Sequence, residues 1–388
     1  MASPTTKTKE TSAITPRQKF EGHTEWVWSI IHLPDGQRVM TGSYDGSLRM
    51  WDVKSGKQIG NDWRDGESKV YGIALSPDGK KVVSASEDGA VRLWDIDTCK
   101  IITKWMGHKD TVKPVCWSPD GRRVLSGSED GTARQWDVEL EKGESIIASK
   151  FEGHTDSVIG AIHLPGGQRI ITCSVDDSLR VWNVKSGKQI GDDWKDSGVR
   201  SIALSPDGKK VVSGGVDGAV RLWDIETCKV IKKWTGHTNG VGSVCWSRDG
   251  QRVLSGSNDG TARQWDVDSG ETILEPVEII PASIETGHET VLAVVYSPDT
   301  TFIATGGRDS LDTGESIEHS VKIWDAKTGK LVAALKGQTD IVWHGAWLGP
   351  RPEKRSSPGH MIRLLGYGIQ PTGSKPRFWI NTPTLSLP

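Results

Sequence analysis

The alternation of apolar and polar residues predicts four short strands in one stretch of the chain. A period of two is typical of strands that bury one face. The turn sequences Ser118-Pro119-Asp120-Gly121 and Asp130-Gly131 separate the runs, and Asp-Gly favours a tight hairpin. The predicted strands are residues 112–118, 123–128, 132–138 and a fourth near 145–151. Together they would form one four-stranded antiparallel sheet.

The phrase that contains these runs recurs along the chain. It consists of Gly-His, then Ser-Pro-Asp-Gly or a variant, then Ser-x-Asp-Gly, and finally Trp-Asp. Its closing tryptophans are Trp51, Trp94, Trp136, Trp182, Trp223, Trp265 and Trp324. Five of the six spacings lie between 41 and 46 residues and the last is 59, against the ~40–45 residues of one propeller blade. This regularity predicts seven copies of one unit.

On these motifs the chain resembles the WD-repeat family of β-propellers over residues 19–335. The resemblance implies an all-β, seven-bladed β-propeller whose neighbouring blades pack face to face. It also implies a hydrogen-bonded tetrad in each complete blade, made of the Gly-His histidine, a strand hydroxyl, the hairpin aspartate and the tryptophan. The five sets are His23, Thr41, Asp45, Trp51; His108, Ser126, Asp130, Trp136; His154, Thr172, Asp176, Trp182; His237, Ser255, Asp259, Trp265; and His288, Thr305, Asp309, Trp324.

The second and fifth copies lack Gly-His. They keep only the hydroxyl, the aspartate and the tryptophan, namely Ser84, Asp88, Trp94 and Ser213, Asp217, Trp223. A buried indole N–H needs a partner, so the hydroxyl remains useful without the histidine. We expect these two blades to be less rigid than the others.

Copies one to three reappear almost unchanged as copies four to six, so the positions that differ stand out. One lies five residues after the Gly-His histidine, and the other precedes the hairpin aspartate. In the resembled fold both lie on one face around the central channel, where aromatic and arginine side chains are usual anchors. The candidate partner-binding residues are Trp28, Tyr44, Tyr71, Lys113, Glu129, Arg200 and Arg308. The alternative is that solvent tolerates any side chain at these positions.

Two insertions should lie on the same face, at blade seven. Residues 275–286 lengthen the loop before the last Gly-His, and residues 310–320 replace a two-residue turn. Long loops in a compact repeat are often functional. The second insertion is acidic, with Asp312, Glu315 and Glu318, and would suit a basic partner. The alternative is that both insertions are disordered.

The ends of the chain set the predicted domain boundaries: an N-terminal tail over 1–13, the propeller over 14–337, and a C-terminal region over 338–388. Residues 14–20 and 330–336 compete for the outer strand of blade seven, since an open ring leaves an exposed edge. We favour a poorly ordered basic tail for the C-terminal region. The alternative is a degenerate repeat that forms an irregular eighth blade, completed by the N-terminal strand.

Composition narrows the class of function. Lysine and arginine total 48 and aspartate and glutamate total 50, a net charge of −2, so no broad field attracts nucleic acid or an anionic membrane. No apolar run approaches the ~18 residues of a membrane span. The five cysteines have neither metal-site nor redox spacing and are expected to be reduced, in an intracellular, cytoplasmic protein, with a nuclear location also open.

We therefore expect no enzyme, no metal and no cofactor. The five Gly-His histidines lie in five different blades, and no nucleophile, base and orienter stand together outside the tetrads. The expected function is a scaffold that binds a protein or peptide on the Gly-His face, with no oligomeric state defined. The repeats also resemble the sensor propellers of fungal and bacterial signal-transducing ATPases of the NACHT type, without the ATPase domain. The alternatives are a subunit of a multiprotein complex such as a ubiquitin ligase, and a nucleic-acid-associated protein acting through its basic tail.

Overall fold

The computed structural model describes residues 18–139, 147–195, 197–268, 283–309, 319–338, 364–367 and 377–381. Within these residues the regular elements are β-strands, as the alternating pattern predicts. Seven four-stranded sheets follow one another along the described chain, each made of four consecutive strands. We number these sheets as blades 1 to 7 in chain order. They confirm the prediction of an all-β, seven-bladed β-propeller.

Blade 3 shows how the repeat folds. It contains β10 (Val112–Trp117), β11 (Arg123–Ser128), β12 (Thr132–Asp137) and β13 (Ile147–Glu152), all antiparallel. In the first turn Gly121 adopts φ 68° and its N–H donates to the carbonyl of Ser118 at 2.9 Å. The predicted strands therefore agree with the observed ones to within a few residues, because local turn chemistry sets their ends.

The other blades repeat this order. Blade 1 contains β2 (Val27–His32), β3 (Arg38–Ser43), β4 (Ser47–Asp52) and β5 (Gln58–Arg64); blade 2 contains β6 (Val70–Leu75), β7 (Lys81–Ser86), β8 (Val91–Asp95) and β9 (Lys100–Trp105). Blade 4 contains β14 (Val158–His163), β15 (Arg169–Ser174), β16 (Ser178–Asn183) and β17 (Gln189–Lys195); blade 5 contains β18 (Val199–Leu204), β19 (Lys210–Gly215), β20 (Val220–Asp224) and β21 (Lys229–Trp234). Blade 6 contains β22 (Val241–Trp246), β23 (Arg252–Ser257), β24 (Thr261–Asp266) and β25 (Ser283–Glu285); blade 7 contains β26 (His288–Tyr296), β27 (Phe302–Asp309), β28 (His319–Asp325) and β29 (Leu331–Gln338).

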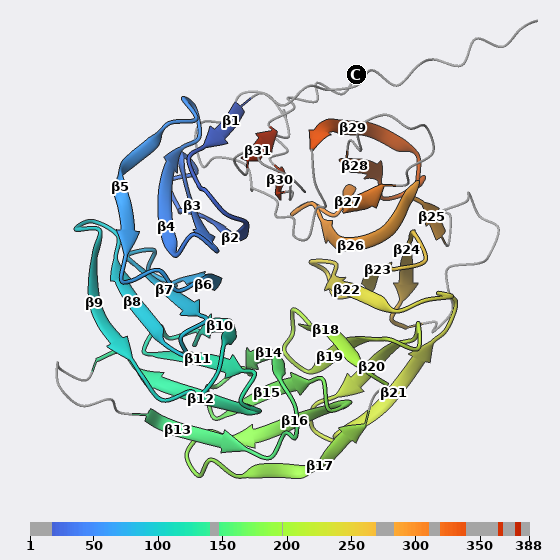
Figure 1. The fold of residues 1–388 in the computed structure, drawn as a ribbon. Helices are drawn as coiled ribbons and strands as arrows, with labels where there is room; N and C mark the ends of the chain where they lie inside the picture. Colours follow the sequence, from blue (N-terminus) through green and yellow to red (C-terminus); the bar gives the residue numbers. More distant parts are fainter. Residues whose placement is uncertain are drawn as a thin grey trace, which may run out of the picture.

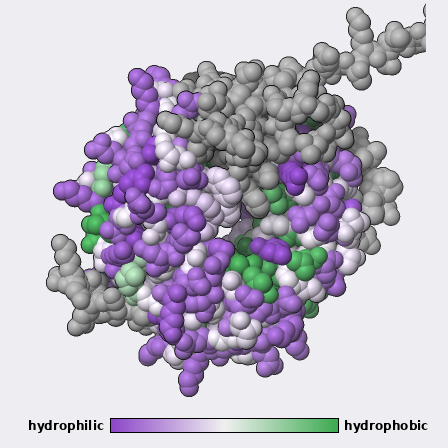
Figure 2. Space-filling view, viewed as in Figure 1, coloured by the Kyte–Doolittle hydropathy of each residue, from purple (hydrophilic) through white to green (hydrophobic). Residues whose placement is uncertain are grey.

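The blades stand in a ring (Figure 1), and the space-filling view shows the opening at its centre, which we call the central channel (Figure 2). The first strand of each blade is the innermost, and innermost strands of neighbouring blades contact one another, as β2 contacts β6 and β18 contacts β22. The fourth strands lie at the rim. This arrangement brings the loops that precede the innermost strands close to the channel.

The core lies between the blades, where their faces meet. Between blades 2 and 3, the buried residues Val83, Val91 and Trp105 pack against Val112, Val124 and Trp136. Trp105 and Trp136 stack with ring centroids 5.8 Å apart. Full burial of one such apolar side chain contributes on the order of 1.5–3 kcal/mol. Since every blade has two neighbours, the ring rather than the single sheet carries the stability.

The ring closes between blades 7 and 1 in a way that the sequence left open. Strand β29 pairs with β28 as the fourth strand of blade 7, so the prediction that residues 14–20 could fill this position is wrong. Instead β1 (Gln18–Glu21) pairs with β31 (Arg377–Asn381), which also pairs with β30 (Leu364–Tyr367). This three-stranded sheet lies beside β2 and β29 (Figure 1).

The sheet of β1, β31 and β30 is arranged as expected for an irregular eighth blade, in which the N-terminal strand pairs with strands of the C-terminal region. The boundary expected after residue 337 falls inside β29, which continues to Gln338. The expected tail over 1–13 lies outside the described residues. The insertion at 275–286 is not all loop, because its residues Ser283–Glu285 form β25, the fourth strand of blade 6.

Candidate functional site

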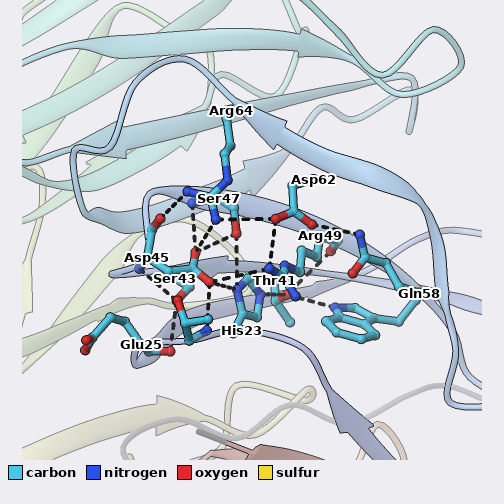
Figure 3. Close-up of polar contacts among 12 residues, drawn as sticks. His23, Glu25, Thr41, Ser43, Asp45, Ser47, Arg49, Gln58, Asp62 and Arg64 are labelled. Carbon is cyan, nitrogen blue, oxygen red and sulfur yellow. Dashed lines mark hydrogen bonds and ion pairs between the residues drawn. The ribbon is translucent and has the colours of Figure 1, made fainter. Parts of the chain in front are cut away.

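In blade 1 four side chains form a single chain of hydrogen bonds (Figure 3). Nδ1 of His23 lies 2.8 Å from Oδ2 of Asp45, and Nε2 of His23 lies 2.7 Å from Oγ1 of Thr41. The indole N–H of Trp51 donates to the same Oγ1 atom at 2.9 Å. An unpaired buried polar group costs about 1–3 kcal/mol, so this chain lets four polar side chains lie inside the blade.

The same bonds join the four expected residues in blades 3, 4, 6 and 7. The histidine Nε2 atom lies 2.7–2.8 Å from the strand hydroxyl in blades 3, 4 and 6, and 3.3 Å from Thr305 in blade 7. The tryptophan donates to that hydroxyl at 2.8–2.9 Å in all four. Each histidine Nδ1 atom faces the hairpin aspartate, which is Asp130, Asp176, Asp259 or Asp309.

Burial sets the protonation of these groups. Desolvation lowers the pKa of all five tetrad histidines, so their imidazoles are neutral near pH 7. Burial by itself would raise the pKa of Asp45, but hydrogen bonds from His23, Ser47 and the Thr24 N–H outweigh it and lower that pKa. A neutral imidazole therefore donates to a carboxylate. Both ring nitrogens of each tetrad histidine are used in hydrogen bonds that hold the blade together.

In blades 2 and 5, which lack the histidine, the hairpin aspartate binds the arginine that stands two residues before the tryptophan in blades 1 to 6. The guanidinium of Arg92 donates to the carboxylate of Asp88 at 2.5 and 3.1 Å, and Arg221 makes the same fork with Asp217. Arg92 also donates to Asp65 at 2.8 Å. The hairpin aspartate thus keeps a charged partner in the absence of Gly-His. That these two blades are less rigid than the others stays a prediction.

The two variable positions of each repeat lie on one face, which we call the channel face. It is made of the loops before the innermost strands, the first two residues of those strands, and the hairpins between the second and third strands. The backbone N–H of Tyr44 donates to the carbonyl of Trp26 at 2.7 Å, which joins the hairpin to that loop in blade 1. Matching bonds run from Glu87 to Lys69, Glu129 to Thr111, Val175 to Ser157 and Asn258 to Gly240.

Four aromatic side chains gather on the channel face of blades 1 and 2. Tyr44 stacks against Trp28 with ring centroids 5.3 Å apart and against Trp26 at 5.5 Å. Tyr71 of blade 2 lies 4.8 Å from Tyr44 and 5.8 Å from Trp28. Trp26 is 37% exposed and the other three are partly buried. We call these four residues the aromatic cluster.

Two ion pairs border the aromatic cluster. The Lys69 ammonium lies 5.7 Å from the ring centre of Tyr44 and 2.9 Å from Oε1 of Glu87. The Lys113 ammonium lies 5.7 Å from the ring centre of Tyr71 and 2.5 Å from Oε1 of Glu129. Burial, the hydrogen bond with Tyr71 and the two glutamates raise the pKa of Tyr44, which keeps its hydroxyl protonated.

The channel face of blades 4 to 7 carries different side chains. Val175 and Val216 are 42% and 44% exposed, Ile159 is partly buried and Arg200 is exposed. In Figure 2 apolar side chains gather beside the central opening, at the position of β18 and β22. In blade 7 Arg308 pairs with Glu289 at 3.1 Å. Arg200 and Arg308 therefore lie apart from the aromatic cluster.

Sequence reasoning placed Trp28, Tyr44, Tyr71, Lys113 and Glu129 at candidate positions, and the structure brings these five together. It missed Trp26 and Lys69, which also border the cluster. A signal was present for Trp26, because the second triplet has Ser157 at the matching place. The acidic insertion at 310–320 lies outside the described residues except for the first two residues of β28.

The same described residues contain no group of three or more His, Cys, Asp or Glu side chains arranged to hold a metal ion. They also contain no helix long and apolar enough to cross a membrane. The five cysteines are free thiols, and burial raises the pKa of Cys116 and Cys245 to about 12.

Seven segments of the chain match the family model described as WD domain, G-beta repeat. They are residues 14–52, 60–95, 99–137, 146–183, 189–224, 228–266 and 281–325, well over half of the chain. The chain belongs to the WD40 family. Each WD40 segment ends at one of the Trp-Asp or Trp-Asn pairs and contains the first three strands of one blade, whose fourth strand follows the end of the segment.

Similar proteins carry the same repeat. The small ribosomal subunit protein RACK1 of Medicago sativa and that of Glycine max are each 42% identical over 41 residues, 11% of this chain and 13% of theirs. The ribosome biogenesis protein ERB1 of Debaryomyces hansenii is 45% identical over 40 residues, 10% of this chain and 5% of its own. The matched part of these WD40 relatives is thus about one repeat long.

A solved structure matches the fold over nearly the whole chain. The crystal structure of the computationally designed Ika8 protein has a TM-score of 0.72, with 23% sequence identity, and the match covers 94% of this chain and 99% of that one. At this identity the likeness shows the fold alone. The WD40 assignment and the propeller architecture therefore rest on independent findings.

Proposed function

We propose that this WD40 chain is a non-catalytic scaffold that binds a protein or peptide on the channel face. The observation that carries the proposal is the aromatic cluster of Trp26, Trp28, Tyr44 and Tyr71, partly exposed beside the central channel. Tryptophan and tyrosine are the residues most enriched at the energetic centres of protein interfaces. The tetrad of blade 1 links the segments that carry Trp28 and Tyr44, so this part of the cluster is presented on a hydrogen-bonded support.

The duplication supports this choice of face. The two triplets of blades share their framework residues, yet Trp28, Tyr44 and Tyr71 stand where the second triplet has Ile159, Val175 and Arg200. Solvent exposure alone does not favour aromatic side chains. Their accumulation at adjacent positions of two blades is what a binding surface requires.

Two finer assignments belong to the same proposal. The repeats are those of a sensor propeller of the signal-transducing ATPase type, acting here as a cytoplasmic recognition module. A subunit of a multiprotein assembly, such as a substrate receptor, uses the same face and is the second candidate. A nucleic-acid partner is not favoured, because the net charge is −2 and gives no broad positive field.

The test is affinity capture from cell extract with the intact chain and with a double variant, Trp28→Ile and Tyr44→Val. Both replacements are the residues that blade 4 carries at the same positions, so the fold accommodates them. We expect specific partners to be lost from this variant. An Ile101→Ser variant at the rim, on β9, is the control and should keep them. Capture of the same partners by the double variant, with unchanged circular dichroism and melting temperature, would reject the channel face.

A further inference from the structure

Lys69 and Lys113 occupy two similar places beside the aromatic cluster. Each ammonium lies 5.7 Å from the ring centre of a tyrosine, Tyr44 or Tyr71, and within ion-pair distance of a glutamate. A ring face with a carboxylate beside it is a favourable site for a cation. Each lysine reaches the tyrosine of the preceding blade, so both sites form only when the blades are assembled.

We propose that these two places are cation subsites, filled by the chain's own lysines when no partner is bound and by lysine or arginine side chains of a basic peptide segment when one is. The proposal deepens the function given above and rests on it. Binding is then an exchange in which Lys69 and Lys113 swing into solvent. The incoming cations take over Glu87 and Glu129.

Exposure makes both lysines easy to displace. The side chains of Lys69 and Glu87 are 43% and 44% exposed, and those of Lys113 and Glu129 are 38% and 32% exposed. Exposed lysine–carboxylate pairs contribute little to stability, because water competes with them and the lysine loses rotamer freedom. An arginine has the advantage over lysine, since its planar guanidinium binds a carboxylate through two parallel bonds and stacks on an aromatic ring.

The surrounding charge favours a basic partner. The loops of blades 1 to 3 on this face also carry the exposed Glu25, Glu67 and Asp110, against the exposed Lys109. Once Lys69 and Lys113 are matched by their glutamates, acidic side chains are in excess. A peptide that brings two or more positive charges therefore meets an attractive local potential.

The second triplet provides a natural comparison. Its matching positions hold Val175 and Arg200 in place of the tyrosines, Val216 and Asn258 in place of the glutamates, and Gly198 and Gly242 in place of the lysines. The described part of blades 4 to 6 thus has no equivalent of either subsite. It also shows that the backbone accepts Glu87→Val and Glu129→Asn, which makes these substitutions suitable tests.

The probe is a fluorescein-labelled peptide of alternating glycine and arginine with four arginines, and its counterpart with four glutamates. Fluorescence anisotropy with the intact chain measures both dissociation constants. We expect the arginine peptide to bind, and to bind about fivefold more tightly when Lys69→Ala and Lys113→Ala remove the competing cations. The pair Glu87→Val and Glu129→Asn should weaken its binding at least about tenfold.

The inference would be overturned if the arginine peptide bound the lysine variant no more tightly than it binds the intact chain. It would also be overturned if the intact chain bound the glutamate peptide more tightly than the arginine peptide, or if the arginine peptide bound neither the intact chain nor any variant. The capture experiment separates this failure from failure of the scaffold proposal. Loss of cellular partners from the Trp28→Ile, Tyr44→Val variant would leave the channel face in place with a different partner chemistry. Retention of those partners would reject the face itself.

Discussion

The hydroxyl of Tyr296 in blade 7 donates a 2.8 Å hydrogen bond to Oε1 of Gln264 in blade 6, and Nε2 of Gln264 donates to the carbonyl of Ala326 at 3.0 Å. Three blades earlier, Gln135 and His163 hold the same register positions in their sheets. Both are buried, with 1% and 6% exposed. Neither the Gln135 amide nor the His163 ring has a hydrogen-bond partner within the described residues. The junction of blades 3 and 4 therefore buries polar groups without hydrogen bonds, whereas the matching groups at the junction of blades 6 and 7 are hydrogen-bonded.

Replacing the imidazole of His163 with a longer phenol should supply the missing hydrogen bond at the junction of blades 3 and 4. We expect His163→Tyr to raise the free energy of unfolding by about 1–2 kcal/mol, because the phenol reaches the Gln135 amide. Tyr296→Phe should lower it by about 1 kcal/mol through loss of the existing bond. Urea denaturation at pH 7.5 measures both. A His163→Tyr variant less stable than the parent would show that the pocket of blade 4 does not accept the longer ring.

Stability should fall in mild acid, in part through His163. Burial lowers the pKa of His163 to about 4, from an ordinary value of 6.5 in the unfolded chain. The unfolded state therefore binds the proton more readily, so this stability is present above pH 6.5 and is lost as the pH falls toward 4. From pH 7.5 to 5 the loss from this group is about 2 kcal/mol.

The check is the difference in free energy of unfolding between the two pH values. This difference should be smaller in His163→Tyr than in the parent. Part of the difference should remain, because burial also lowers the pKa values of the tetrad histidines. Equal pH dependence in the variant and the parent would contradict the role of His163.

The tetrad hydroxyl should matter more than the hydroxyl of a blade without histidine. Ser126 joins the imidazole of His108 to the indole of Trp136, whereas Ser84 serves Trp94 without a histidine. We expect Ser126→Ala to destabilise the protein by about 2–3 kcal/mol, since it leaves both the imidazole and the indole without this partner. Ser84→Ala should cost about 1 kcal/mol, since it leaves only the indole of Trp94 unpaired. Thermal and urea unfolding of the two variants decide the point, and equal losses would count against it.

Cys99 and Cys228 stand in a strained turn position. Their φ angles are 58° and 57°, in the left-handed region, where blades 1 and 4 have Gly56 and Gly187 at 69° and 68°. Glycine adopts this conformation without the steric penalty of a Cβ atom. We expect Cys99→Gly to raise the free energy of unfolding by about 1 kcal/mol.

The matched control is Cys99→Ala, which keeps the Cβ atom and should give no gain. Both can be compared by urea denaturation under reducing conditions. A gain from alanine equal to that from glycine would mean that removal of the thiol, not relief of backbone strain, stabilises the turn.

Much of the fold follows from local features of the chain. The strands of blade 3 could be predicted because alternation and the Asp-Gly and Pro-Asp-Gly turns act within a few residues. The tetrads could be assigned because their members recur at fixed spacings inside one repeat, so a blade that folds brings them together. The candidate positions Trp28 and Tyr44 were found in the same way, from the comparison of the two triplets.

Contacts between residues of different blades could not be predicted from the repeat pattern. That Tyr44 of blade 1 meets Tyr71 of blade 2, or that Lys113 of blade 3 lies over Tyr71, depends on how neighbouring sheets are rotated about the channel. The same holds for the unpaired Gln135 and His163. The repeat places an arginine two residues before the tryptophan in blades 1 to 6, but only the folded blade shows that Arg92 binds Asp88 where the histidine is absent.

The sequence by itself determined the repeat unit, the number of complete blades and the residues that hold each blade together, because these depend on short-range pattern and spacing. The tertiary structure alone decided that β1 pairs with β31 and that the aromatic cluster forms with its two lysines. A strand's edge accepts any partner of suitable length, and side chains of different blades meet only in the closed ring. Geometry, not local preference, selects among those contacts.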